Sequence, residues 1–161
     1  LLSVENEPAT KTITARVIAD TGGLFVRTLI INAGRGDGVK DGQAVMSAEG
    51  LVGRIVETGE SSSRVLQLAD FNSRIPIVVS PSGQRAILAG DNTDWPQLLF
   101  FTNKQSISLG NYVLTSGHGG LFPPGLPVGV ISKLGEGSVR VQPFINWHQI
   151  EYVKVLNYSI N

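Results

Sequence analysis

Leu51-Val52-Gly53-Arg54-Ile55 and Pro127-Val128-Gly129-Val130-Ile131 are two similar stretches of the sequence, each an apolar strand with a glycine at its centre. A glycine inside a strand is typical of a β-bulge or of a place where two backbones approach closely. The recurrence of this pattern indicates that one half of the chain repeats the other.

Five further pairs of segments repeat in the same order along the chain. They are residues 14–17 with 86–89, 29–31 with 98–101, 42–45 with 110–113, 65–67 with 139–141, and 72–78 with 146–153. The offset stays at roughly 70 residues, drifting by a few, and ordered self-similarity of this kind indicates an internal duplication.

The repeated segments are short, and several alternate between apolar and polar residues, which is typical of β-strands. The chain has 19 glycines and 8 prolines, which predict many turns between the strands. No stretch keeps a helical period for more than about ten residues. We therefore predict an all-β protein of two small, related six-stranded β-barrels in tandem, with little or no helix. Barrel closure removes the exposed edges that so many short strands would otherwise leave.

The repeat also predicts the domain boundaries. Residues 1–11 are interpreted as the end of an upstream helix or a linker, because Pro8 stops a helix from continuing. Residues 12–82 are assigned to the first barrel and residues 83–161 to the second. The last strand could instead return to the first barrel, which would make both domains discontinuous.

Composition excludes several classes of function. Thirteen basic and thirteen acidic residues give a net charge of zero, so we expect no nucleic-acid partner. The absence of cysteine excludes a disulfide-stapled domain and a thiolate metal site. The glycine-rich turn at residues 34–38 lacks the spacing and the following helix that bind phosphate. We therefore expect no cofactor-binding residue and no metal ligand.

Two-barrel proteins include serine proteases, so the residues that could form a catalytic triad have to be considered. Ser116 and His118 would need Asp70 or Asp91 as the third member. Two residues apart on a strand, the serine and the histidine point the same way, so the base does not face the hydroxyl. No glycine-bracketed serine preceded by aspartate is present. We expect no catalytic residue, and a protease-like hydrolase is the weaker alternative.

The aromatic residues admit two interpretations. Trp95 and Trp147, with Tyr112, Tyr152 and Tyr158, could stack on sugars or bases. Because no basic patch surrounds them, we expect them to pack in the core instead. A peptidoglycan-binding module remains an alternative function.

The segment 119–127 is the candidate contact with a partner protein. It sets Leu121, Phe122 and Leu126 among glycines and prolines. Prolines fix φ and remove donors, so the segment is stiff and loses little entropy on binding. Alternatively, Phe122 and Leu126 plug the end of the second barrel.

Several stretches, taken together, resemble the MreC family of bacterial rod-shape-determining proteins. They are residues 32–45, 50–53, 63–66, Asp70-Phe71-Asn72-Ser73-Arg74-Ile75-Pro76, Gly110-Asn111-Tyr112-Val113-Leu114-Thr115-Ser116-Gly117, and 120–129. They cover most of the chain in the family's order. Asn111 departs from the family pattern, which often has aspartate after the glycine.

The resemblance implies a non-enzymatic scaffold of the cell-elongation machinery, with its barrels on the periplasmic side of the cytoplasmic membrane. Its implied partners are the elongation-specific penicillin-binding transpeptidase, MreD and other membrane elongation proteins, and further copies of itself in dimers or filaments. It also implies an N-terminal membrane helix and a coiled coil upstream of the barrels. Leu1 and Leu2 are interpreted as the last residues of that coiled coil, the rest of which lies outside this sequence.

Overall fold

The computed structural model describes residues 11–20 and 26–157. The expected end of an upstream coiled coil therefore lies outside the described residues, apart from Lys11. Within the described residues the secondary structure is almost entirely β-strand, with three short 3-10 turns and no α-helix. None of the described helices is long and apolar enough to cross a membrane.

The strands follow one another at short intervals. They are β1 (Lys11–Asp20), β2 (Thr28–Ile31), β3 (Ala44–Met46), β4 (Leu51–Thr58), β5 (Ser63–Gln67), β6 (Arg74–Ser80), β7 (Gln84–Ala89), β8 (Gln97–Leu99), β9 (Tyr112–Thr115), β10 (Pro127–Gly135), β11 (Ser138–Pro143) and β12 (Tyr152–Asn157). The 3-10 turns are η2 (Arg35–Asp37), η3 (Lys104–Ser106) and η4 (His118–Gly120).

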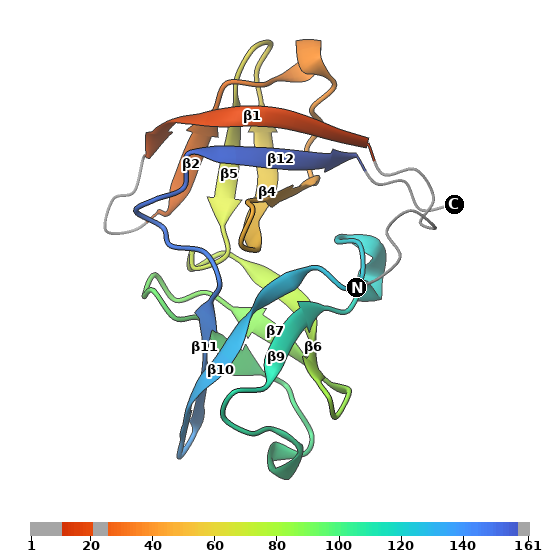
Figure 1. The fold of residues 1–161 in the computed structure, drawn as a ribbon, viewed down its shortest axis with the longest axis vertical. Coiled ribbons are helices and arrows are strands. Elements are labelled where there is room, and N and C mark those ends of the chain that lie inside the picture. The colour runs from red at the N-terminus through yellow and green to blue at the C-terminus, as the bar shows by residue number, and fades with distance from the viewer. Residues whose placement is uncertain (1–10, 21–25, 158–161) are drawn as a thin grey trace.

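The strands close into two antiparallel barrels of six, stacked end to end (Figure 1). The first barrel has the order β1-β12-β3-β4-β5-β2, and the second has the order β10-β11-β8-β7-β6-β9. This arrangement confirms the predicted fold class of an all-β protein with two six-stranded barrels.

The chain does not divide between the barrels at residues 82 and 83, as the repeat had suggested. Strand β6 pairs with β7 and β9 and completes the second barrel. Strand β12 pairs with β1 and β3 and completes the first, so the alternative that the last strand returns to the first barrel is correct. Each repeat thus supplies its sixth strand to the other barrel. The alternating pattern of a strand fixes its buried face but not the neighbours with which it pairs, which explains the error.

The two barrels are nevertheless built in the same order. Around the closed ring, β1, β12, β3, β4, β5 and β2 correspond to β7, β6, β9, β10, β11 and β8. The correspondence extends to irregularities in the register. Val45 pairs with Gly53 and Val113 with Gly129, and in both cases the next pair skips one residue of the longer strand. The duplicated glycines therefore lie beside duplicated bulges.

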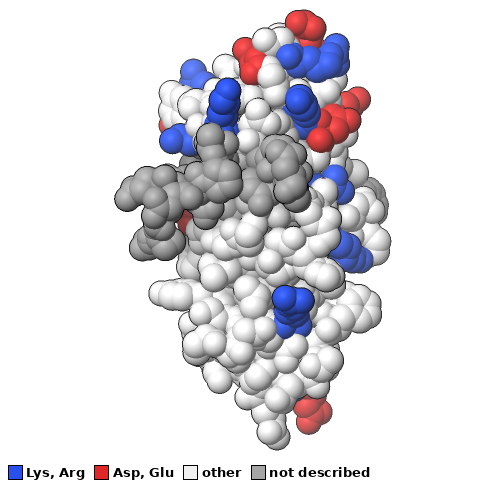
Figure 2. Space-filling view, turned by 90° about the vertical axis from the view of Figure 1, so that its right-hand side faces the viewer, with Lys and Arg blue, Asp and Glu red and all other residues white. Residues whose placement is uncertain are grey.

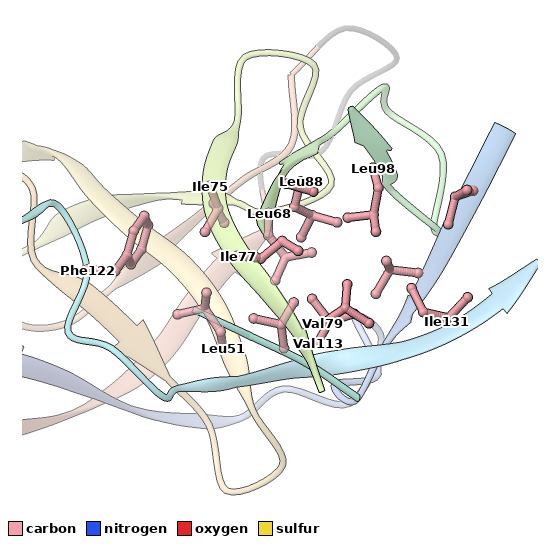
Figure 3. Close-up of a cluster of buried hydrophobic side chains, with 14 of the residues drawn as sticks. Leu51, Leu68, Ile75, Ile77, Val79, Leu88, Leu98, Val113, Phe122 and Ile131 are labelled. Carbon is pink, nitrogen blue, oxygen red and sulfur yellow. The ribbon is translucent and has the colours of Figure 1, made fainter. Parts of the chain in front are cut away.

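Each barrel has a core, and the second core extends into the first barrel. The first core includes Ile31, Val45 and Ile55. The second includes Ile77, Val113 and Ile131, together with Leu51 from the first barrel (Figure 3). Trp147 packs against both cores. Because apolar contacts cross the junction, the barrels support one another.

Candidate partner-binding surface

An uncharged surface covers one side of the second barrel. Residues 105–132 contain no Asp, Glu, Lys or Arg, and they supply β9, η4 and most of β10. Figure 2 shows this side as nearly free of charge, whereas charged residues gather on the first barrel. Extended uncharged surface is typical of protein contact sites, because charged residues are depleted at the centres of interfaces.

Strands β6, β9 and β10 present apolar side chains outward on this side. Val78 lies opposite Leu114, and Tyr112 lies opposite Val130. The alternate residues Ile77, Val79 and Val113 point inward and are fully buried, because successive side chains of a strand point to opposite faces of the sheet. We call Val78, Tyr112, Leu114 and Val130 the apolar face. Tyr112 is 58% exposed, and its ring edge contacts Phe144 at 5.9 Å between centroids.

The segment after β9 is held rigidly by one buried side chain. The Thr115 hydroxyl donates to the carbonyl oxygen of Pro123 at 2.6 Å and accepts from the backbone N–H of Leu126 at 2.8 Å. Thr115 is 1% exposed, so both hydrogen bonds are shielded from water. Gly117 has a φ of 77°, and a β-carbon there would press on Pro124. The segment is therefore preorganised, as the prolines predict.

The three side chains of the candidate contact segment lie in different surroundings. Phe122 is 2% exposed and packs in the core of the second barrel (Figure 3). Leu126 is half-buried and packs against the same core. Leu121 is 43% exposed. Phe122 thus occupies the position that the plug interpretation describes, and Leu121 is the member of the three that solvent can reach.

Leu121 also lines a hollow between the two barrels. Its other lining residues include Lys40 and Gln43 of the first barrel and Pro123 of the second, and its volume is about 370 Å³. Sequence reasoning missed this hollow, and its expectation that Tyr112 and Tyr152 pack in the core was wrong, because both are 58% exposed. Tyr158 lies outside the described residues. The run of uncharged residues from 105 to 132 was visible in the sequence and could have directed attention to this side.

The residues of the hypothetical protease triad make other contacts. Both oxygens of buried Asp70 accept backbone hydrogen bonds, from Arg27 N–H at 2.6 Å and from Asn72 N–H at 2.7 Å. The carboxylate of Asp91 is bound by Arg140 and Thr93. Among the described residues, no three His, Asp or Glu side chains gather as a metal site would require.

The comparison with known proteins gives a family match over most of the chain. Residues 17–157 match the model of "Rod shape-determining protein MreC, barrel core". The cell shape-determining protein MreC of Cereibacter sphaeroides is 41% identical over 97% of this chain and 52% of its own length. That of Caulobacter vibrioides is 39% identical over 97% of this chain and 45% of its own length. The chain spans about half the length of these relatives.

Solved structures agree. The crystal structure of MreC from Pseudomonas aeruginosa has a TM-score of 0.84 at 31% identity, over 90% of this chain and 98% of that one. A major periplasmic domain of the cell shape-determining filament MreC has a TM-score of 0.82 at 24% identity, over 94% and 100% of the two chains. A complex between Penicillin-Binding Protein (PBP2) and MreC from Helicobacter pylori has a TM-score of 0.72 at 13% identity, over 93% and 100%. These last two likenesses show the fold alone.

Proposed function

The chain belongs to the MreC family of rod shape-determining proteins, and from that premise we propose that it is a non-enzymatic scaffold that binds a penicillin-binding transpeptidase. The observation that carries the proposal is the rigid, uncharged apolar face of the second barrel, extended by Leu121. The existence of a complex between a fold neighbour and PBP2 supports the choice of partner.

The surface has the features that a protein contact needs. The apolar face lies on paired strands of a closed barrel, so its side chains are fixed before binding. The hydrogen bonds of Thr115 fix the segment that carries Leu121. A preformed surface loses little conformational entropy on association, which leaves more of the apolar burial as net affinity. Tyr112, the exposed tyrosine of this face, is the kind of anchor on which binding energy concentrates.

The remaining parts of the proposal rest on the family resemblance. We place the barrels on the periplasmic side of the cytoplasmic membrane, attached to it by an N-terminal helix upstream of this sequence. MreD, other membrane elongation proteins and further copies of the chain are the other proposed partners. β1 begins at Lys11, paired with Asn157, so the chain enters through the first barrel. The apolar face lies on the second barrel.

The experiment is retention of a purified transpeptidase. The chain is immobilised and offered the ectodomain of the elongation transpeptidase from its own organism, alongside a penicillin-binding protein of division as control. We expect saturable retention of the elongation enzyme only. Equal retention of both enzymes, or of neither, would contradict the proposal.

A further inference from the structure

A second hollow at the junction of the barrels is lined by aromatic and polar side chains that the scaffold function does not use. Its volume is about 260 Å³, and its lining includes Trp95, Phe144, Asn146 and Trp147. We propose that this hollow binds an N-acetylated hexosamine of a glycan chain. The size supports a small occupant, because pockets for drug-sized ligands begin at about 300 Å³.

The aromatic residues supply flat apolar surface for a sugar ring. Trp95 is 38% exposed and therefore presents part of its indole to solvent. Trp147 and Phe144 line the same hollow. Amphipathic aromatic side chains combine a large apolar face with a polar edge, which suits a ligand with one apolar face and many hydroxyls. The sequence alone favoured core packing for both tryptophans, and this is correct for Trp147 only in part, since it packs against both cores and also lines the hollow.

One polar group in this wall lacks a partner. The indole nitrogen of Trp147 is buried and makes no hydrogen bond to any described residue. A buried donor without an acceptor is costly, so such a group in a native protein calls for an explanation. The indole N–H only donates, so an oxygen of a ligand, such as a sugar's acetamide carbonyl or hydroxyl, would be its acceptor once the Trp147 side chain turns toward the hollow.

The charge of the hollow favours a neutral ligand. Asp94 is its one carboxylate, and Arg27 Nη1 lies 3.0 Å from the Asp94 oxygen. Gln142, Asn146 and His148 add groups that can donate or accept. Hydroxyls and an acetamide match this mixture, whereas an anionic ligand would meet the carboxylate.

The walls are preorganised. The carbonyl oxygen of Trp95 accepts a hydrogen bond from Arg140 Nη1 at 3.1 Å, and the same guanidinium binds the Asp91 carboxylate. Among the other lining residues, the Asn146 side chain accepts from the backbone N–H of His148 at 3.0 Å. Since hydrogen bonds fix the backbone at Trp95 and at Asn146, a sugar would bind at the cost of little ordering beyond a turn of the Trp147 side chain.

The duplication provides a matched control. In the structure Asp70-Phe71-Asn72 precedes β6 as Asn146-Trp147-His148 precedes β12, although the sequence repeat had paired residue 72 with residue 146. The backbone N–H of Asn72 donates to the Asp70 side chain as that of His148 does to the Asn146 side chain. Phe71 is 57% exposed and does not line the hollow; it lies against the Arg74 guanidinium instead. Phe71→Ala therefore removes an exposed aromatic ring from the equivalent loop without touching the proposed site.

The test is a titration of the 161-residue chain with tetra-N-acetylchitotetraose, with maltotetraose as the sugar that lacks acetamides. Both tryptophans of the chain line the hollow, so intrinsic tryptophan fluorescence reports on this site alone. Saturation transfer to the ligand's acetyl methyl protons, followed by NMR, gives a readout that needs no tryptophan.

We expect saturable binding of the chitotetraose only. Trp95→Ala should weaken it by at least about tenfold, because the exposed stacking ring is lost. Trp147→Phe, which keeps a ring and removes the N–H, should weaken it also, and Phe71→Ala should leave it unchanged. Should Trp147→Phe fail to fold, Trp95→Ala decides the matter. No saturable binding at millimolar sugar, equal binding of both sugars, or unchanged binding by folded Trp95→Ala would overturn the proposal.

Discussion

Gly53 of β4 lies so close to the carbonyl oxygen of Leu66 in β5 that a β-carbon at position 53 would overlap that oxygen. Gly129 of β10 stands in the same relation to the carbonyl oxygen of Gln142 in β11. In both barrels, the obstacle is backbone of a paired strand, which cannot turn aside as a flexible side chain can. The glycines are therefore required for the close approach that the sequence pattern indicated.

Gly53→Val and Gly129→Val should each lower the free energy of unfolding by about 1–3 kcal/mol or more, because the new side chain forces the paired strands apart. Chemical denaturation of each variant measures this. Gly135→Ala is the control, since a β-carbon there would meet only the Ser138 oxygen, at 3.8 Å. Wild-type stability of either valine variant would show that the close approach is absent.

The exchange of sixth strands predicts that neither half of the sequence folds alone. Residues 1–82 contain β6 but lack β12, so the first barrel stays open between β1 and β3. Residues 83–161 lack β6, so the second barrel stays open between β7 and β9. Open barrels expose unpaired edges and core. Each half should therefore melt without cooperativity, and an equimolar mixture should recover a cooperative transition. A cooperative transition of either half by itself would refute the exchange.

The two neighbours Phe122 and Leu121 should respond differently to substitution. Phe122→Ala should cost about 3–5 kcal/mol of stability, because it leaves a cavity in the core of the second barrel. Leu121→Ser should leave stability almost unchanged, since the side chain is 43% exposed. Thermal melts of the two variants separate these effects. Comparable losses of stability in both would mean that Leu121 is structural and not available to a partner.

Acid should weaken the hydrogen bonds of the Asp91 carboxylate, which help to hold the loop that contains Trp95. Burial acts to raise the pKa of Asp91, but the hydrogen bonds from Thr93 and Arg140 outweigh it and hold that pKa below its usual value of 3.8. A carboxyl with a lowered pKa contributes its full stability above the pKa of the unfolded chain, and loses it as the pH falls through the folded value. The stability difference between the wild type and Asp91→Asn should therefore be constant above about pH 5 and shrink below pH 3.8. A difference that does not change with pH would assign the effect to packing.

The repeat could be predicted from the sequence because both barrels have glycines at equivalent positions and the same alternation of apolar and polar residues along their strands. Gly53 and Gly129 identify equivalent bulges, and from them the two barrels follow. The strands that pair with β6 could not be predicted from the sequence. Pairing between distant strands depends on the geometry of the whole barrel, which the local alternation of residues does not determine. The surroundings of the aromatic residues were hidden for a similar reason. Phe122 and Trp147 look alike as apolar residues in loops, yet one lies within a core and the other spans two cores and a hollow.

The central claim is that the apolar face of the second barrel binds the transpeptidase, and two tyrosines provide the most direct measurement. Tyr112 and Tyr152 are both 58% exposed, and each begins a strand, on the second and the first barrel respectively. The affinity of the transpeptidase ectodomain is measured for Tyr112→Ser and for Tyr152→Ser. We predict a loss of at least about tenfold, or 1.4 kcal/mol, for Tyr112→Ser and no change for Tyr152→Ser. Unchanged affinity in a stably folded Tyr112→Ser chain, or an equal loss in both variants, would contradict the account.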